Sequence, residues 1–134
     1  MAEIKKYSKK RDQNSLIELM KSEGDDWSCY LNKKALPKYL IALDTSITYV
    51  AYQEDSICGY VRGIDDYGLY IYLCDLLVDK KHRGKAIGKK LMEAVCKDYP
   101  NSIVYVMSDV DEYYQKLGFE KEGSVFKVKN SNKF

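Results

Sequence analysis

The chain has 134 residues, a length that fits one domain with a single core, and we expect residues 1–134 to form that domain. Hydrophobic residues make up 46% and charged residues 31% of the chain, as in soluble globular proteins rather than disordered or fibrous ones. The 22 basic and 20 acidic residues give a formal net charge of +2, which argues against a dedicated nucleic-acid-binding protein because such proteins carry a strongly basic surface.

The first third of the chain predicts one strand and two helices. A short strand is expected over residues 2–7, and Asp12 or Asn14 can cap a helix that carries apolar residues on one side. The segment 23–27 contains turn residues and no apolar period, so it predicts a loop. A second helix is expected near residues 33–43.

From Ser46 onward the period changes to two, and this period is typical of a strand: Ile47, Tyr49 and Ala51 alternate with Thr48, Val50 and Tyr52. The pattern predicts three consecutive antiparallel strands over residues 47–52, 57–64 and 69–78, joined by short turns. The third of these is the longest apolar stretch of the chain and is rich in residues that favour strands.

The last third predicts a helix, a strand, a short helix and a final strand. Apolar residues at helical spacing predict a helix that begins near Ile87 and ends before Pro100. A buried strand over Ile103–Met107 follows, and the strand, helix, strand order implies a right-handed parallel crossover. We expect a short helix over residues 110–117 and a closing strand over residues 119–128.

The four cysteines lie far apart and form no CxxC pair, which argues against a metal site. The polar start of the chain does not resemble a signal peptide, and no apolar run approaches the roughly 20 residues needed to span a bilayer. We therefore expect a cytoplasmic protein without membrane attachment, in which the cysteines are buried thiols.

Basic residues are concentrated between the third predicted strand and the helix after it. Six Lys and Arg residues lie between positions 80 and 90, although cations near a helix N-terminus are each unfavourable by about 0.3–1 kcal/mol. A bound polyphosphate would offset this unfavourable positive charge. The free backbone N–H groups at the helix start would point toward the phosphates, and Gly84 and Gly88 allow the backbone to approach them closely. The alternative is a solvated basic turn whose glycines only shape the loop.

Three stretches, in this order, resemble the motifs of the GNAT superfamily of acetyl-CoA-dependent N-acetyltransferases: Leu76-Leu77-Val78, Arg83-Gly84-Lys85-Ala86-Ile87-Gly88 and Tyr114-Gln115-Lys116-Leu117-Gly118-Phe119. The order of predicted elements follows that family over essentially the whole chain. The resemblance implies an α+β fold in three layers, with a mixed, mostly antiparallel twisted sheet, helices on both faces and the parallel crossover at the coenzyme site. Ala86 stands where the family usually has Gly, and we expect binding to survive because Ala tolerates helical dihedrals.

The resemblance implies acetyl-CoA as the acetyl donor and no metal. The backbone amides of residues 83–88 would receive the pyrophosphate, and the backbone of Leu76–Val78 would pair with the pantetheine arm like an added strand. An N–H of Leu77 or Val78 would polarise the thioester carbonyl. Relatives often bind pantetheine through an Asn where this chain has Ser108 and Asp109. The expected coenzyme contacts are Leu76, Leu77, Val78, Arg83, Gly84, Lys85, Ala86, Ile87, Gly88, Lys89 and Asp109.

Tyr114 and Asp75 are the candidate catalytic residues. Tyr114 matches the tyrosine that faces the coenzyme sulfur in the resembled family and can protonate the departing thiolate, although it could also be a packing residue. Adjacent helical positions point about a hundred degrees apart, so only one of Tyr113 and Tyr114 should face the cleft. Asp75 lies in an apolar strand, where an unpaired carboxylate costs several kcal/mol. It therefore has either a task with the substrate amine or a structural explanation, in which it reaches solvent at a strand bulge or pairs with a Lys.

The resemblance places the loop that contains Trp27 and Tyr30 on the acceptor side. These aromatic residues follow Asp25 and Asp26, so they can form an aromatic and acidic rim for a cationic amine, while Trp27 could equally be a loop anchor. The predicted acceptor contacts are Trp27, Tyr30 and Asp75. The predicted function is acetyl transfer from acetyl-CoA to a primary amine, small-molecule or peptide, by direct attack. The alternative is a non-catalytic acyl-CoA-binding or sensing module, and a second copy of the chain is a further candidate partner.

Overall fold

In the part of the chain that the structure describes, five strands form the open sheet at the centre of the fold: β1 (Glu3–Lys6), β2 (Ile47–Gln53), β3 (Ser56–Asp66), β4 (Tyr70–Val78) and β5 (Ile103–Val106). The computed structural model describes residues 1–129. The strands follow one another in the sheet in the order β1-β2-β3-β4-β5. The pairs up to β3–β4 are antiparallel and β4–β5 is parallel, which confirms the predicted crossover between two parallel strands.

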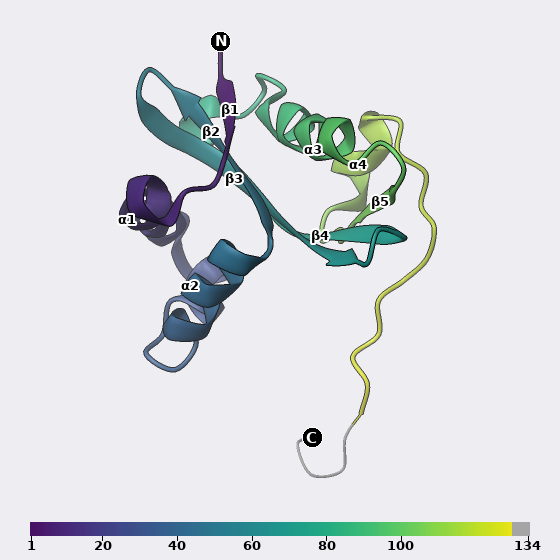
Figure 1. Cartoon of the computed structure of the whole chain (residues 1–134), viewed down its shortest axis with the longest axis horizontal. Coiled ribbons are helices and arrows are strands. Elements are labelled where there is room, and N and C mark those ends of the chain that lie inside the picture. Colours follow the sequence, from purple (N-terminus) through teal and green to yellow (C-terminus); the bar gives the residue numbers. More distant parts are fainter. Residues whose placement is uncertain (130–134) are drawn as a thin grey trace.

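Helices cover both faces of the sheet, as predicted (Figure 1). One face carries α1 (Lys9–Ser22) and α2 (Leu36–Thr45), and the other carries α3 (Ile87–Asp98). The short elements are η1 (Gly24–Tyr30) and η2 (Lys80–His82), which are 3-10 helices, and α4 (Asp111–Lys116), which follows β5. Among the described residues, no helix is long and apolar enough to cross a membrane.

Two apolar clusters stabilise the two faces. Ile71 and Leu73 of β4 pack with Leu91 and Val95 of α3, and these four side chains are fully or almost fully buried. On the opposite face, a second cluster joins α1 and α2 to the sheet; its buried members are Leu16, Leu19, Met20, Tyr39, Leu43, Val50, Tyr60 and Leu77. Burial of this apolar area on both faces is the main stabilisation of the layered fold.

A one-residue β-bulge in β4 changes which of its side chains point to each face of the sheet. Arg62 of β3 is in register with Asp75, but the next residue, Gly63, is in register with Leu73, so Cys74 is the extra residue. A bulge reverses the alternation of side chains along a strand. Before it, Leu73 faces α3, and after it Asp75 and Leu77 face the side of α1 and α2. The bulge thus turns Asp75 into the layer between the sheet and the first helices.

The start of α1 differs from the prediction. The helix begins at Lys9 with Ser8 at its N-cap, so the expectation that Asp12 or Asn14 caps it is wrong. Asp12 instead lies inside the helix and accepts the Ser8 backbone N–H at 2.8 Å. Its carboxylate also accepts hydrogen bonds from Arg11 and Tyr52. A carboxylate one turn inside the helix therefore satisfies a donor at the helix start.

The connection between the first two helices is more regular than predicted. Residues 23–27 were expected to form a loop, but Gly24–Tyr30 form η1. The predicted helix near 33–43 is observed as Leu36–Thr45, with Pro37 in its first turn. Of the cysteines, expected to be buried thiols, only Cys58 is buried; Cys29 and Cys96 are exposed and Cys74 is intermediate.

The predicted closing strand over residues 119–128 is wrong. Residues 119–129 have no regular secondary structure, and Figure 1 shows them as an extended segment that leaves the domain after α4. Val125, Phe126 and Val128 are exposed. A segment becomes a strand only when a neighbour completes the hydrogen-bond ladder, and within residues 1–129 no strand pairs with the outer edge of β5.

Candidate active site

The strands β4 and β5 separate halfway along β4. Their parallel pairing joins Tyr70–Leu73 to Ile103–Val106, and the Met107 N–H then donates to the Leu73 carbonyl at 2.9 Å. In the part of the chain that the structure describes, residues 74–78 have no strand neighbour on this side. Half of β4 therefore presents an open backbone edge, to which an extended ligand could pair as a strand would.

A cleft of about 840 Å³ opens at this separation. Its floor is the second half of β4, one wall comes from η1, and the other wall comes from the segment after β5 and from α4. The lining residues are Glu23, Asp26, Trp27, Cys29, Tyr30, Cys74, Asp75, Leu76, Leu77, Val78, Lys80, Arg83, Met107, Ser108, Asp109, Val110, Tyr113 and Tyr114. The fold thus brings together the predicted catalytic and acceptor residues, the strand motif, Arg83 and Asp109.

The loop before α3 continues from the end of this cleft. Among the described residues, no hydrogen bond is formed by the backbone N–H groups of residues 83–86, and the first-turn N–H groups of α3 have no acceptor within the helix. Gly84 has φ +83°, a left-handed conformation that glycine adopts without strain. Ile87 is buried against the sheet, so only its backbone can reach a ligand. The loop therefore presents free donors suited to an anion.

The backbone of Ala86 does not have the helical conformation that was expected. Coenzyme binding was predicted to survive the Gly-to-Ala difference because Ala accepts helical dihedrals. Ala86 is instead the N-cap of α3, with φ +61° and ψ +23°. This left-handed conformation costs an L-residue with a Cβ about 1–2 kcal/mol. The fold therefore holds Ala86 in a conformation that glycine would adopt more readily.

We expect Ala86→Gly to raise the free energy of unfolding by about 1 kcal/mol, because glycine removes the Cβ strain at this positive φ. Urea denaturation measures the change. Ala94→Gly is the matched control, since Ala94 lies inside α3, where glycine should lower stability by about 0.5–1 kcal/mol. Destabilisation by both changes would show that Ala86 is not strained.

Arg83 spans the mouth of the cleft. Its Nε donates to the Val78 carbonyl at 3.0 Å, and its Nη2 donates to Oε2 of Glu23 at 2.8 Å. The Glu23 side chain is largely buried, whereas the Arg83 side chain is half exposed. An anion that binds to Arg83 must therefore compete with Glu23, the residue that precedes η1.

Asp75 has three hydrogen-bond donors. Tyr30 donates to its Oδ1 at 2.9 Å, while Tyr39 and the Nε of Arg62 donate to its Oδ2 at 2.7 and 2.6 Å. Asp75 and Arg62 form a buried ion pair, with side-chain exposures of 3% and 11%. Burial and the Asp75 charge raise the pKa of Tyr30, so its phenol stays protonated as the donor. Sequence analysis missed Arg62 and Tyr39, and the β3–β4 register would have been the signal for Arg62.

Both tyrosines of α4 line the cleft, so the expectation that only one would face it is wrong. Burial, and next the charge of Asp109, raise the pKa of Tyr114 to about 12, which keeps its phenol protonated at neutral pH. The Tyr113 hydroxyl lies against α3, where a Cβ at Gly88 would collide with it. Gly88 therefore allows α4 to pack closely on the first turn of α3.

Trp27 packs on two tyrosines and also lines the cleft. Its ring lies 5.9 Å, centroid to centroid, from the rings of Tyr30 and of the fully buried Tyr60. It therefore anchors η1 to the sheet, and it also lines the cleft. With Tyr30 it forms an aromatic wall beside Asp75.

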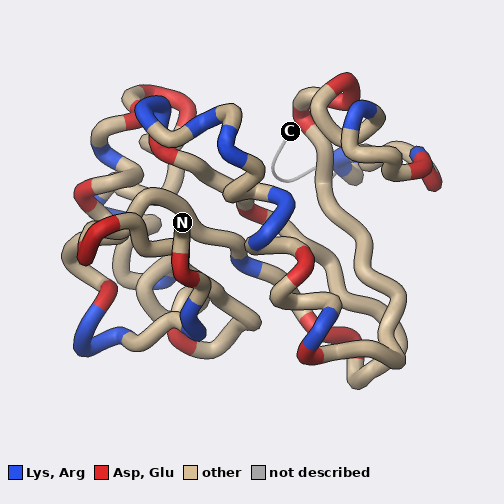
Figure 2. The backbone as a smooth tube through the Cα atoms, turned by 90° about the horizontal axis from the view of Figure 1, so that it is seen from above, with Lys and Arg blue, Asp and Glu red and all other residues tan. Residues whose placement is uncertain are grey.

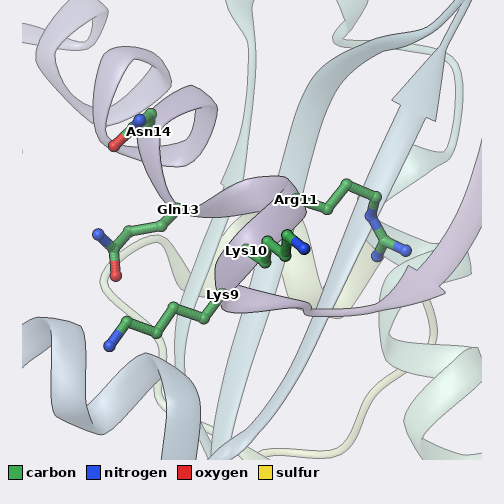
Figure 3. A pocket seen from close by; sticks show the side chains of 5 residues that line it. All are labelled: Lys9, Lys10, Arg11, Gln13 and Asn14. Atoms are coloured by element: carbon green, nitrogen blue, oxygen red, sulfur yellow. The ribbon is translucent and has the colours of Figure 1, made fainter.

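A second hollow, of about 450 Å³, lies at the start of α1. Figure 3 shows that its side chains do not converge, since Lys9 and Gln13 extend to one side and Arg11 to the other. Arg11 is held by Asp12 and the Lys6 carbonyl. Charges of both signs are also interspersed along the rest of the backbone (Figure 2). This hollow therefore lacks the converging donors of the first cleft.

Comparison with known proteins gives a family from the sequence and a fold from solved structures. The model of the protein family described as "Acetyltransferase (GNAT) domain" matches residues 44–121. A chloroplastic GCN5-related N-acetyltransferase from Arabidopsis thaliana is 32% identical over 75 residues, which are 52% of this chain and 29% of that protein. A histone acetyltransferase from Glycine max is 29% identical over 75 residues, 52% of this chain and 32% of that protein. The chain thus matches about a third of the length of these relatives.

Solved structures with the same fold cover nearly the whole chain. An aminoglycoside acetyltransferase from an uncultured soil metagenomic sample has a TM-score of 0.74 at 20% identity and covers 98% of this chain and 99% of its own. A GNAT family acetyltransferase from Streptococcus pneumoniae has a TM-score of 0.70 at 20% identity, and the match covers 97% of this chain and 100% of that chain. These likenesses establish the fold.

Proposed function

Because this chain belongs to the GNAT acetyltransferase family, we propose that it transfers an acetyl group from acetyl-CoA to a primary amine, by direct attack of the amine on the thioester. The observation that carries the proposal is the separation of β4 from β5. It leaves the backbone of residues 74–78 open on one edge, and the free amides of the loop before α3 follow at its end. The aminoglycoside acetyltransferases among the structures of this fold favour a small cationic amine as the acceptor.

The donor side of the cleft fits an extended arm that ends in phosphates. Pantetheine would pair with Leu76–Val78, and the pyrophosphate would lie on the amides of residues 83–89. Ser108 already donates to Oδ1 of Asp111 at 2.7 Å, which fixes it to the start of α4. Both residues line the cleft, and because the Ser108 hydroxyl proton is already donated to Asp111, we assign the pantetheine amides to the Asp109 carboxylate.

The acceptor side is built around Tyr30 and Asp75. Because the Tyr30 hydroxyl donates its proton to Asp75, its oxygen keeps lone pairs that can accept an N–H of the incoming amine. In this proposal Asp75, which is paired with Arg62, acts on the acceptor through Tyr30, and the amine proton passes to a water molecule or, through Tyr30, to this carboxylate. Bound acetyl-CoA supplies the activated acyl group. The Val78 N–H then polarises the carbonyl, since it faces the open edge, whereas the Leu77 N–H points toward β3 as the Asp79 N–H does. Tyr114 donates toward the sulfur.

Release of free thiol from acetyl-CoA, measured with a panel of amines, tests this function. We expect release that requires both acetyl-CoA and a cationic primary amine. Calorimetric binding of acetyl-CoA without thiol release for any amine would contradict catalysis and would support the alternative of a non-catalytic acyl-CoA-binding module. The cytoplasmic location stays a prediction, since one relative is chloroplastic by name.

We expect Arg83→Glu to weaken acetyl-CoA binding more than tenfold. Hydrogen bonds to charged groups contribute about 1.5–3 kcal/mol, and about 1.4 kcal/mol corresponds to a factor of ten in the dissociation constant. Glu23→Gln is expected to strengthen binding, because it releases Arg83 from its ion pair. Titration calorimetry at two salt concentrations measures both effects, and added salt should weaken binding to the wild-type protein.

Lys97→Glu is the control for these variants, because it makes the same charge reversal in the last turn of α3, away from the loop. Equal dissociation constants for the Arg83 and Lys97 variants would remove the phosphate site from this loop.

A further inference from the structure

Within residues 1–129, no helix covers part of the sheet face that carries α1 and α2. α1 packs on β3 and α2 packs on β2, and Figure 1 shows that neither reaches the end of the sheet where β4 and β5 pair. Because Ile71 and Leu73 face α3, their neighbours Tyr70 and Tyr72 face the opposite way. The same alternation places Tyr105 of β5 on this open face, since Val104 and Val106 pack toward α3.

Three tyrosines form a cluster there, which we name the tyrosine shelf: Tyr70, Tyr72 and Tyr105. The ring of Tyr105 lies 5.7 Å, centroid to centroid, from the ring of each of the other two, with planes within 24° of parallel. Tyr72 is 39% exposed, and Ile64, its register partner on β3, is 51% exposed. An exposed aromatic surface of this kind is a typical ligand-binding feature.

The tyrosine shelf is continuous with the cleft. Tyr72 lies two residues before Cys74 and Tyr105 lies two residues before Met107, and both Cys74 and Met107 line the cleft. A strand rises about 3.3 Å per residue, so Tyr72 is roughly 13 Å along β4 from Leu76. A single ligand that reaches from the acetyl position to the tyrosine shelf must therefore be at least that long.

The charged side chains on this face of the sheet favour the binding of a cation. Asp66 is the register partner of Tyr70 and so lies on the same face. Arg62 is the one cation among the β3, β4 and β5 residues of this face, and its charge is balanced by Asp75. A carboxylate next to tyrosine rings matches an ammonium group, which binds both to the negative charge and to aromatic rings.

We propose that the tyrosine shelf binds the far end of a long polycationic amine while its reacting amine lies beside Tyr30, an inference that rests on the proposed function. The acceptor class is therefore a polyamine, linear or carried on amino-sugar rings, whose amines are spaced by roughly 13 Å or more. A short diamine fills the cleft and does not reach the tyrosine shelf.

The test compares acceptors of two lengths in the wild-type protein and in Tyr72→Ala. We expect the substitution to raise the KM for spermine about tenfold more than the KM for 1,3-diaminopropane, with no change in the KM for acetyl-CoA. A multi-ring aminoglycoside is the third acceptor and distinguishes amino sugars from linear polyamines. Tyr67→Ala is the control, because Tyr67 is the most exposed tyrosine and lies in the turn outside the tyrosine shelf.

Two results would overturn the proposal. One is an equal change in KM for the short and the long acceptor, or no change for either. The other is light scattering that shows a dimer of the wild-type protein and a monomer of Tyr72→Ala, because a second copy would then cover the tyrosine shelf. If the wild-type protein acetylates no amine, the proposed function fails separately. In that case the binding of spermine is measured by calorimetry. A dissociation constant that rises in Tyr72→Ala and not in Tyr67→Ala supports the tyrosine shelf, and equal dissociation constants for the two variants overturn it.

Discussion

Tyr114→Phe is expected to lower kcat by about 10²–10⁴-fold and to leave the dissociation constant of acetyl-CoA near its wild-type value. Phenylalanine keeps the aromatic packing on Phe119 and removes only the hydroxyl that donates toward the departing sulfur. General acid catalysis by a positioned side chain typically contributes a factor of this size. Steady-state kinetics and calorimetry on the same preparation separate the two effects.

The pKa of Tyr114, raised to about 12, adds a pH dependence to this prediction. A raised pKa keeps the donor protonated below about pH 12, so Tyr114 should not cause a loss of activity between pH 6 and 10. The rate should instead rise with pH as the acceptor amine loses its proton. Tyr113→Phe is the control and should have a milder effect. A larger effect of the Tyr113 variant, or a descending limb below pH 10 that disappears in Tyr114→Phe, would contradict the assignment.

Asp75→Asn is expected to lower the free energy of unfolding by about 3–5 kcal/mol. The substitution leaves the buried Arg62 guanidinium without its counter-charge, and breaking a buried pair in this way typically costs that much. Urea denaturation measures the loss. Glu112→Gln, which breaks an exposed pair with Lys116, is the control and should leave the midpoint unchanged.

The same variant tests the role of Asp75 toward the acceptor. The folded fraction should acetylate cationic amines more slowly, and part of this loss should be relieved at high pH, where more of the amine is neutral. Full stability together with wild-type kinetics across pH 6–9 would contradict both roles. Lost stability with normal turnover would leave Asp75 a structural residue that holds Tyr30 and Tyr39.

Local sequence patterns predicted most of the sheet because they encode local structure. The alternation of residues 47–52 and the apolar run of residues 69–78 became β2 and β4, and the spacing after Ile87 became α3. The glycines and cations at positions 80–90 pointed to a loop whose amides are free in the structure. These features depend on neighbours close in sequence, which periodicity can detect.

The features that sequence analysis missed depend on distant partners or on unusual backbone. A strand bulge at Asp75 was one of the alternatives left open, but no local pattern places the extra residue at Cys74 or predicts that Asp75 meets Arg62. Ala86 looked compatible with a helix, but the turn into α3 requires a positive φ there. Residues 119–128 were expected to close the sheet, yet within residues 1–129 they have no strand neighbour to complete a hydrogen-bond ladder.

Backbone amide chemical shifts of ¹⁵N-labelled protein, followed while acetyl-CoA is added, test the central claim most directly. If the coenzyme lies along the open edge of β4 and on the loop before α3, the largest shift changes will fall on residues 76–78 and 83–89. Changes confined to the hollow at Lys9–Asn14, or no saturable changes at all, would contradict the site.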